Sequence, residues 1–346
     1  MDTLSKEPAV GVFHGGDIGL AEKIHGHPQH GWLDLSTGIN PKPYPFREIG
    51  FEAYSKLPQR NSLEKLKGEA QRFYGTPSSD NVVPAPGTQA LIQWLPRLRG
   101  FSRVAVVGPT YEEHFKVWNA VGHKVTMCGT PGEAPEDTEV MVVVSPNNPD
   151  GRRYPPDELE ALRKDLAIRG GWLVVDEAFA DVIPDLSLAG HCNKGGLIIL
   201  RSFGKFFGLA GVRLGFALTN AALAKHLADA LGPWAISGPA EAIGIQALGD
   251  KAWIEKTRRV LATGRQQLET LLKRKGFEIA GGTDLFLLIN SEVTEEFHIH
   301  LARQGIWTRA FPEYPAWLRL GQPGSKKNWD RLKVALAGWD GVSGEE

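Results

Sequence analysis

The chain of 346 residues is longer than the size at which one hydrophobic core usually stops growing, so its length favours two domains. With 42% hydrophobic residues, 23% charged residues and a formal net charge of −1, it has no overall basic field to attract nucleic acid or an anionic membrane. Its two cysteines, Cys128 and Cys192, make neither a disulfide framework nor a zinc motif, so no metal site is expected. No apolar signal-peptide core and no stretch of ~18 apolar residues is present, and we therefore expect a soluble, cytoplasmic protein without a membrane span.

Residues 1–45 are rich in glycine, histidine and proline, which is typical of an extended arm with turns. The segments His14–Gly19 and Ser36–Pro45 show this composition most plainly. Such an arm has too few apolar side chains to build a core of its own. We therefore expect it to lie across another surface of the protein.

Residues 46–225 alternate short apolar runs with helical patterns, which predicts an α/β domain with a largely parallel sheet. The runs are rich in Val, Ile and Leu and mostly continuous, as expected for strands that are buried on both faces. These predicted strands are Val104–Val107, Met141–Val144, Trp172–Val175, Leu197–Leu200 and Phe216–Leu218. The predicted helices between them are Thr88–Leu95, Glu113–Ala120 and Pro156–Ile168.

A different pattern follows, and it predicts a smaller α+β domain over residues 226–346. The predicted elements are helices at Ala221–Leu231 and Ile254–Lys275, strands at Phe286–Ile289 and Trp317–Leu320, and a last helix at Trp329–Ala337. In open α/β sheets, ligands bind at the carboxyl ends of the strands. The polar residues that follow the apolar runs are therefore the first candidates for a functional site.

The strongest candidate is the string of residues 201–213, which follows the apolar run ending at Leu200. Its glycines let the backbone approach a ligand closely. Ser202 supplies a hydroxyl and Arg213 a cationic fork, a pair suited to phosphate. Lys205 lies between them, and a lysine held among cationic and apolar groups can have a lowered pKa, so that its neutral amine attacks an aldehyde. The alternative is a solvated loop with ordinary basic residues.

This string resembles the lysine motif of fold-type I enzymes that depend on pyridoxal 5′-phosphate (PLP), in which Ser-x-x-Lys is followed by an arginine. Arg213 stands eight residues after Lys205, as in that motif. The resemblance implies the aspartate-aminotransferase fold, an α/β architecture with a large, mostly parallel domain and a smaller α+β domain. It also implies that PLP is carried as a Schiff base on Lys205.

Asp176 places a carboxylate directly after the apolar run Trp172–Val175. A helix N-cap is one role for such a residue. PLP chemistry also needs an anion against its pyridine nitrogen, and the resemblance assigns that role to Asp176. Many family members carry a tyrosine three residues later that bonds the phenolic oxygen of PLP. Phe179 stands at that position, so this hydrogen bond is missing.

Further cofactor motifs follow the family order. Gly87, Thr88 and Gln89 open a predicted helix and resemble the phosphate loop, in which amides at a helix N-terminus bind phosphate. Tyr111 resembles the aromatic residue that stacks on the PLP ring, with core packing as the alternative. Asn148 resembles the asparagine that donates to the phenolic oxygen, with a simple turn as the alternative.

Arg319 lies inside an otherwise apolar predicted strand and therefore needs an anionic partner. It resembles the family's arginine that binds the substrate α-carboxylate with two hydrogen bonds. A structural carboxylate would satisfy the same arginine.

The arm narrows the choice of reaction, because fold and cofactor do not select it. His14 and Gly15, followed by Gly38 and Asn40, resemble the start of threonine-phosphate decarboxylases of cobalamin biosynthesis. These four residues are therefore candidate substrate ligands. The implied reaction converts L-threonine O-3-phosphate into (R)-1-aminopropan-2-ol O-2-phosphate and CO₂. The alternative for His14 is an arm residue without a binding role.

The second candidate is a histidinol-phosphate-type aminotransferase, which shares the fold, the cofactor and a small phosphorylated amino substrate. In both cases the resemblance implies a homodimer with each active site near the interface. Histidinol-phosphate aminotransferases have a tyrosine that reaches the PLP phosphate of the partner subunit. Leu57 stands at that position and cannot make this contact.

Overall fold

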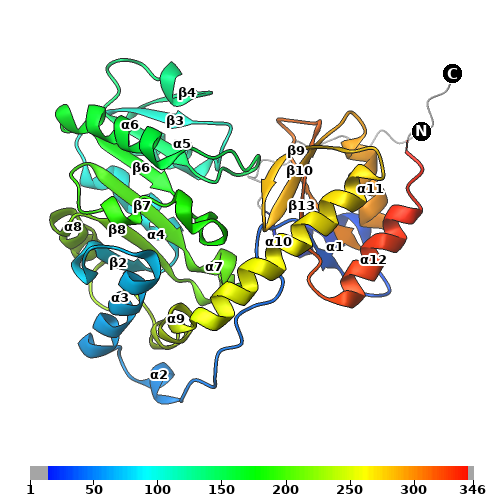
Figure 1. Ribbon diagram of the computed structural model, residues 1–346, viewed down its shortest axis with the longest axis horizontal. Helices are drawn as coiled ribbons and strands as arrows, with labels where there is room; N and C mark the ends of the chain where they lie inside the picture. Colours follow the sequence, from blue (N-terminus) through cyan, green and yellow to red (C-terminus); the bar gives the residue numbers. More distant parts are fainter. Residues whose placement is uncertain (1–14, 342–346) are drawn as a thin grey trace.

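The computed structural model of the protein describes residues 15–341, in which a large sheet layer and a smaller sheet layer lie side by side (Figure 1). The large sheet has seven strands in the order β2-β8-β7-β6-β5-β3-β4. Strand β8 runs antiparallel to its neighbours β2 and β7, and the other neighbouring strands are parallel. The strands are β2 (Val82–Ala85), β3 (Arg103–Val107), β4 (Lys124–Cys128), β5 (Val140–Val144), β6 (Trp172–Asp176), β7 (Leu197–Ser202) and β8 (Gly215–Thr219).

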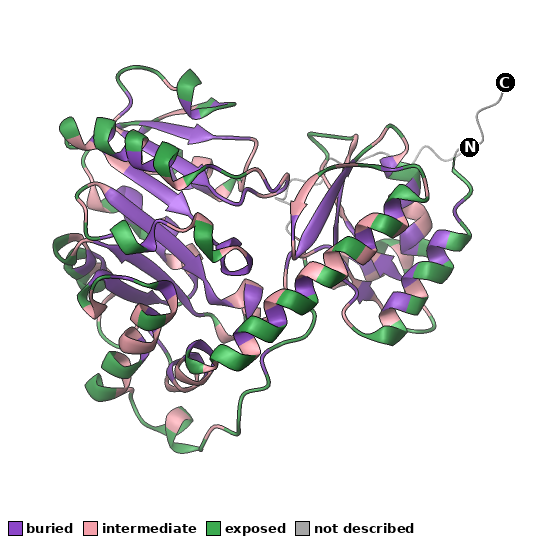
Figure 2. Ribbon diagram, in the orientation of Figure 1, coloured by how far each residue is buried: buried purple, intermediate pink, exposed green. Residues whose placement is uncertain are grey.

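Helices cover both faces of this sheet. Alternate side chains along each strand point to opposite faces, and because these side chains are apolar on both faces, each face needs a covering layer. Val104 and Val106 pack on one side of β3, whereas Ala105 and Val107 pack on the other. The first face is covered by α4 (Thr88–Trp94), α5 (Glu113–Ala120) and α8 (Ala221–Leu231). The second is covered by α3 (Arg60–Tyr74), α6 (Pro156–Ile168) and α9 (Gly238–Gly249). Apart from the partly exposed edge strand β4, the strands are largely buried between these layers (Figure 2), which confirms the predicted parallel α/β fold.

The smaller layer is an antiparallel sheet in the order β12-β13-β10-β9, packed against helices. Its elements are β9 (Glu278–Thr283), β10 (Phe286–Asn290), β12 (Arg309–Ala310), β13 (Trp317–Gly321), α11 (Thr294–Arg303) and α12 (Lys326–Ala337). The long helix α10 (Lys251–Lys273) joins both layers (Figure 1). Its Leu261 packs in the core of the large layer, and its Leu268 packs in the core of the small one.

The boundary predicted between residues 225 and 226 falls inside α8. Helix α8 packs against β2 and α4, and α9 packs against α3. Both helices therefore belong with the large sheet, and after residue 226 the first residue in the core of the small layer is Leu268 on α10. The sequence pattern shifted at α8 because helices replaced strands there, not because a new core began.

The arm lies across both layers, as expected, but it also contributes to a core. It contains α1 (Ile18–His25) and β1 (Leu33–Asp34), which pairs with β11 (Ile306–Trp307) of the small layer. Leu33 and Leu35 pack in the core of that layer. The chain then crosses to the large layer and continues through the short helix α2 (Glu52–Ser55).

The predicted strands and helices are present, with ends that differ by up to three residues. Helix α12 begins before its first buried apolar residue, Trp329, because the Ser325 side chain accepts a hydrogen bond from Asn328 N and caps the helix. No helix within residues 15–341 combines the length and the apolar character needed to cross a membrane.

Candidate active site

A cavity of about 500 Å³ lies between the two layers, at the carboxyl ends of the parallel strands. It collects most of the residues predicted from the sequence: Gly15, Gly38, Gly87, Thr88, Gln89, Tyr111, Asn148, Asp176, Ser202, Lys205, Arg213 and Arg319. His14 lies outside the described residues. Asn40 is described, but it does not line this cavity.

Lys205 lies on the short helix α7 (Phe203–Phe206), directly after β7. Its Nζ lies 5.5 Å from the centre of the Phe179 ring. Burial lowers the pKa of the Lys205 amine to about 8, the cations of Arg319 and Arg213 contribute to this lowering, and Asp176 opposes the shift. A substantial neutral fraction near physiological pH makes this amine a nucleophile for an aldehyde.

Asp176 is the last residue of β6 and is only 4% exposed. Its Oδ1 accepts a hydrogen bond from Ala178 N at 2.9 Å, which holds the carboxylate in a local turn. Its Oδ2 lies 2.9 Å from Nε2 of His114, which is 1% exposed. A buried carboxylate needs such partners, and His114 on α5 supplies one of them.

His114 was not among the residues predicted from the sequence. A signal for it was present, because His114 follows Tyr111 by three residues at the start of the predicted helix. Tyr111 precedes α5, and in the turn that opens this helix the His114 amide donates to the Tyr111 carbonyl at 3.2 Å. The rings of the two residues meet edge to face with centres 6.1 Å apart.

The loop that opens α4 approaches Arg213 closely. Gly87 has φ +82°, and a Cβ at this position would lie 2.5 Å from Nη2 of Arg213. A Cβ at Gly215 would lie 2.6 Å from the Thr88 amide nitrogen. Arg213 forms no ion pair with a carboxylate of residues 15–341. Thr88, the Ser202 hydroxyl and the Arg213 guanidinium thus line one end of the cavity, as a phosphate site requires.

Gln89 holds Tyr111. Its Nε2 donates to Oε2 of Glu113 at 2.7 Å, and its Oε1 accepts from the Tyr111 hydroxyl at 3.2 Å. Because a carboxylate only accepts, this arrangement fixes which end of the amide faces Tyr111. Burial raises the pKa of Tyr111 to about 12, and Glu113 adds to that rise. The Gln89 side chain therefore orients Tyr111. Only the backbone amide of Gln89 is left to face the phosphate.

Arg319 on β13 is 6% exposed and has neutral partners. Its Nη1 donates to Oδ1 of Asn148, its Nη2 donates to the Ser36 carbonyl at 2.6 Å, and its buried Nε has no hydrogen-bond partner. Burial lowers the pKa of this guanidinium, and Asp34 only partly opposes the shift. The structural carboxylate considered as an alternative is not found within 4.0 Å among residues 15–341. A buried cation with such surroundings calls for an anionic ligand.

Arg309 was not predicted from the sequence either, although it also lines the cavity. It lies on β12 directly opposite Arg319 of β13. Like charges at opposite positions of an antiparallel pair destabilise it, and after burial the Arg309 cation also lowers the pKa of Arg319, so this arrangement favours anions nearby. Glu112 and Glu313 supply part of that compensation. The cavity therefore suits a ligand that carries two anionic groups.

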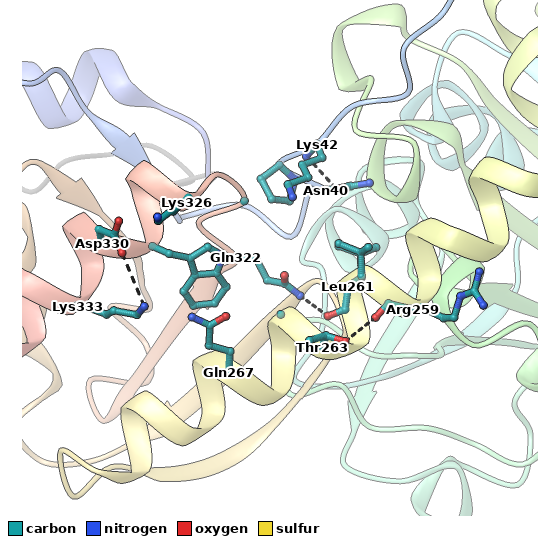
Figure 3. A pocket seen from close by; sticks show the side chains of 15 residues that line it. Asn40, Lys42, Arg259, Leu261, Thr263, Gln267, Gln322, Lys326, Asp330 and Lys333 are labelled. Carbon is teal, nitrogen blue, oxygen red and sulfur yellow. Dashed lines mark hydrogen bonds and ion pairs between the residues drawn. The ribbon is translucent and has the colours of Figure 1, made fainter.

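Asn40, a candidate substrate ligand in the sequence, does not line the cavity that contains Lys205. It lines a second cavity of about 490 Å³ between the arm, α10 and α12 (Figure 3). Its Nδ2 donates to the Phe206 carbonyl and its Oδ1 accepts from the Lys42 amide, both at 2.9 Å. Its backbone amide also donates to the Lys205 carbonyl at 2.9 Å. Asn40 therefore anchors the turn that carries Lys205, and it does not line the predicted substrate site.

The fold and the residues of this cavity define a protein of the aspartate-aminotransferase type. Residues 50–336 match the family model of class I and II aminotransferases, and the chain belongs to this family. It is 45% identical to the threonine-phosphate decarboxylase of Pseudomonas aeruginosa, over 94% of this chain and 97% of the relative. It is 40% identical to the threonine-phosphate decarboxylase of a Sinorhizobium species, over 94% and 98% of the two chains.

The fold also matches a solved histidinol-phosphate aminotransferase from Sinorhizobium meliloti in complex with pyridoxal 5′-phosphate. That structure aligns with a TM-score of 0.78 over 96% of this chain and 97% of the other, at 19% identity. At this level of identity the match shows the shared fold alone.

Proposed function

We infer that the protein is a PLP-dependent carboxy-lyase that converts L-threonine O-3-phosphate into (R)-1-aminopropan-2-ol O-2-phosphate and CO₂, a step of cobalamin biosynthesis. The inference rests on identity to threonine-phosphate decarboxylases over nearly the whole chain. The observation in the site that carries it is the pair Arg309 and Arg319, two facing cations beside Lys205 in one cavity. A carboxylate and a phosphate on one small amino acid match this pair.

The residues of the cavity fit PLP. When bound, PLP withdraws electrons from the bonds of the substrate's Cα. Lys205 would hold its aldehyde carbon and Asp176 its pyridine nitrogen. The amides of Gly87 and Thr88, with Ser202 and Arg213, would hold its phosphate. Tyr111 would stack on its ring.

Asn148 would donate to the phenolic oxygen of the cofactor. Its Oδ1 accepts from Arg319, which leaves its Nδ2 as the donor for that oxygen. Phe179 lines the same wall and has no hydroxyl, so it adds no second donor. A single neutral donor would therefore serve the phenolic oxygen from these two positions.

The chain's own residues select the reaction by holding the substrate at several points. The bond that breaks is the one held across the plane of the cofactor ring, so orientation decides between loss of CO₂ and loss of a proton. Arg319 and Arg309 would each hold one anion of the substrate, which restricts rotation about Cα. Lys205 would deliver a proton to Cα after CO₂ has left, because a lysine with a pKa near 8 donates and accepts protons readily.

A direct assay tests this function. Purified holoenzyme is incubated with L-threonine O-3-phosphate and no 2-oxo acid, and CO₂ release is measured. Catalytic release that is lost in Lys205→Ala is expected. If no CO₂ appears, and histidinol phosphate turns over only when 2-oxoglutarate is present, the enzyme is instead an aminotransferase.

We further propose that the enzyme works as a homodimer in the cytoplasm. Large apolar side chains are exposed on the segment that leads through α2 and on the loop between α8 and α9: Phe46, Phe51, Tyr54, Leu57 and Trp234. Such a group of exposed apolar side chains is typical of an interaction surface. Both cysteines are free and buried, as suits a reducing compartment.

A further inference from the structure

Ser36 touches both the arm and the buried arginine of the active site. It is 1% exposed and lies just after β1. Its carbonyl accepts a hydrogen bond from Nη2 of Arg319 at 2.6 Å. Its hydroxyl accepts a hydrogen bond from the Gly16 amide at 2.7 Å. One residue thus bonds to two parts of the chain that both reach the cavity.

Asp34 fixes the Ser36 hydroxyl. Its Oδ1 accepts from the Ser36 hydroxyl at 2.6 Å and from the Ser36 amide at 2.8 Å. Because the hydroxyl hydrogen is directed at Asp34, the oxygen presents a lone pair to Gly16. Asp34 itself lies on β1, which pairs with β11 of the small layer, so the anchor belongs to a folded strand pair.

The arm lies tightly against the same carbonyl. A Cβ on Gly15 would overlap the Ser36 carbonyl oxygen and would lie 3.4 Å from Nη2 of Arg319. The Gly321 amide donates to the Leu35 carbonyl at 2.7 Å, which holds this segment against the end of β13. The positions of Gly15, Ser36 and Arg319 are therefore mutually dependent.

We propose that Ser36 is a positioning residue that couples docking of the arm to the orientation of Arg319. Its hydroxyl holds the arm at Gly16, and its carbonyl holds the guanidinium that receives the substrate anion. This proposal rests on the anion-binding role of Arg319 in the proposed function. Linkage then requires that arm docking and anion binding strengthen each other by the same factor.

The test compares the wild-type holoenzyme with Ser36→Ala. Loss of one hydrogen bond predicts a rise in KM for L-threonine O-3-phosphate of about 2- to 12-fold. We expect kcat and PLP affinity to stay within about twofold, because the hydroxyl contacts neither Lys205 nor Asp176. Hydrogen exchange of the amides from Gly16 to Leu20 should accelerate by a similar factor.

Asp34 provides a matched pair of variants. Asp34→Asn keeps an oxygen that accepts from the Ser36 hydroxyl, so its arm should exchange as slowly as the wild type. Asp34→Leu removes the acceptor, so its arm should exchange as fast as the arm of Ser36→Ala. If Ser36→Ala does not fold, Gly15→Ala provides a second route, since its added Cβ must displace the arm from the Ser36 carbonyl.

Either half of the result alone overturns the coupling. Faster arm exchange with unchanged KM would show that the arm does not act on Arg319, and a raised KM with unchanged exchange would show that the arm is not held by Ser36. A failure of the proposed function is distinguishable, because the wild type would then release no CO₂. In that case the holoenzyme is titrated with L-threonine, whose carboxylate should slow exchange at Gly16–Leu20 in the wild type and less so in Ser36→Ala.

Discussion

The lowered pKa of Lys205 predicts how the apoenzyme reacts with its cofactor. An amine attacks an aldehyde only when it is neutral. With a pKa of about 8, ~10% of the Lys205 amine is neutral at pH 7, against ~0.03% for an ordinary lysine, which is a difference of ~300-fold. Covalent attachment of PLP should therefore speed up with rising pH and level off above a midpoint near pH 8.

The assay traps the bond chemically. Apoenzyme is mixed with PLP at a series of pH values and quenched with borohydride, and the peptide containing Lys205 is quantified by mass spectrometry. The exposed Lys225 in the same digests is the internal reference for the reagents. This readout does not depend on turnover.

Two variants test whether neighbouring charges shift the Lys205 pKa. Arg319→Met removes a neighbouring cation that lowers the Lys205 pKa, so its midpoint should move up. Asp176→Asn removes an anion that raises this pKa, so its midpoint should move down. A wild-type midpoint near the ordinary lysine value would refute the reasoning, because the amine would then be solvated.

The same shift affects stability. In the unfolded chain Lys205 has the ordinary lysine pKa of 10.5, so it binds a proton more tightly there than in the folded protein, where its pKa is about 8. Between these pH values the unfolded chain therefore holds more protons. The contribution of Lys205 to apoenzyme stability should thus grow as the pH rises through this window.

Three further outcomes are expected. Arg319→Lys keeps the charge but loses the two-pronged guanidinium, so KM for L-threonine O-3-phosphate should rise ~10- to 100-fold in steady-state assays while the cofactor's visible absorbance is unchanged. An equal loss of bound cofactor would contradict the assignment of Arg319 to the substrate. Gly87→Ala places a Cβ 2.5 Å from Nη2 of Arg213 and should weaken PLP binding at least ~10-fold in equilibrium dialysis, whereas Gly50→Ala, with open space around it, should not. Phe51→Glu puts a charge on a residue that is 80% exposed and should shift sedimentation toward the monomer without unfolding the chain; an unchanged sedimentation profile would place the interface elsewhere.

Much of the fold could be predicted because the strands of the large sheet are locally distinctive. The continuous apolar run of β5, Val140–Val144, is buried on both faces, and only a covered parallel sheet provides that environment. Strand β4, Lys124–Cys128, was not predicted, because this edge strand is partly exposed and its sequence lacks such a run. The domain boundary was misplaced because α8 and α9 differ in pattern from the strands although they pack on the same sheet.

The sequence by itself determined the chemistry that depends on short spacing. Asp176 ends β6 and Lys205 follows β7, and the carboxyl ends of these neighbouring parallel strands must meet at one edge. Arg213 precedes β8, which runs antiparallel to β7 and begins at that same edge. Only the tertiary structure decided which distant side chains face one another. It placed Arg309 opposite Arg319 and turned Asn40 away from the cavity. Strand register and the packing of the arm set these contacts over separations of ten to more than 150 residues, and no local pattern encodes them.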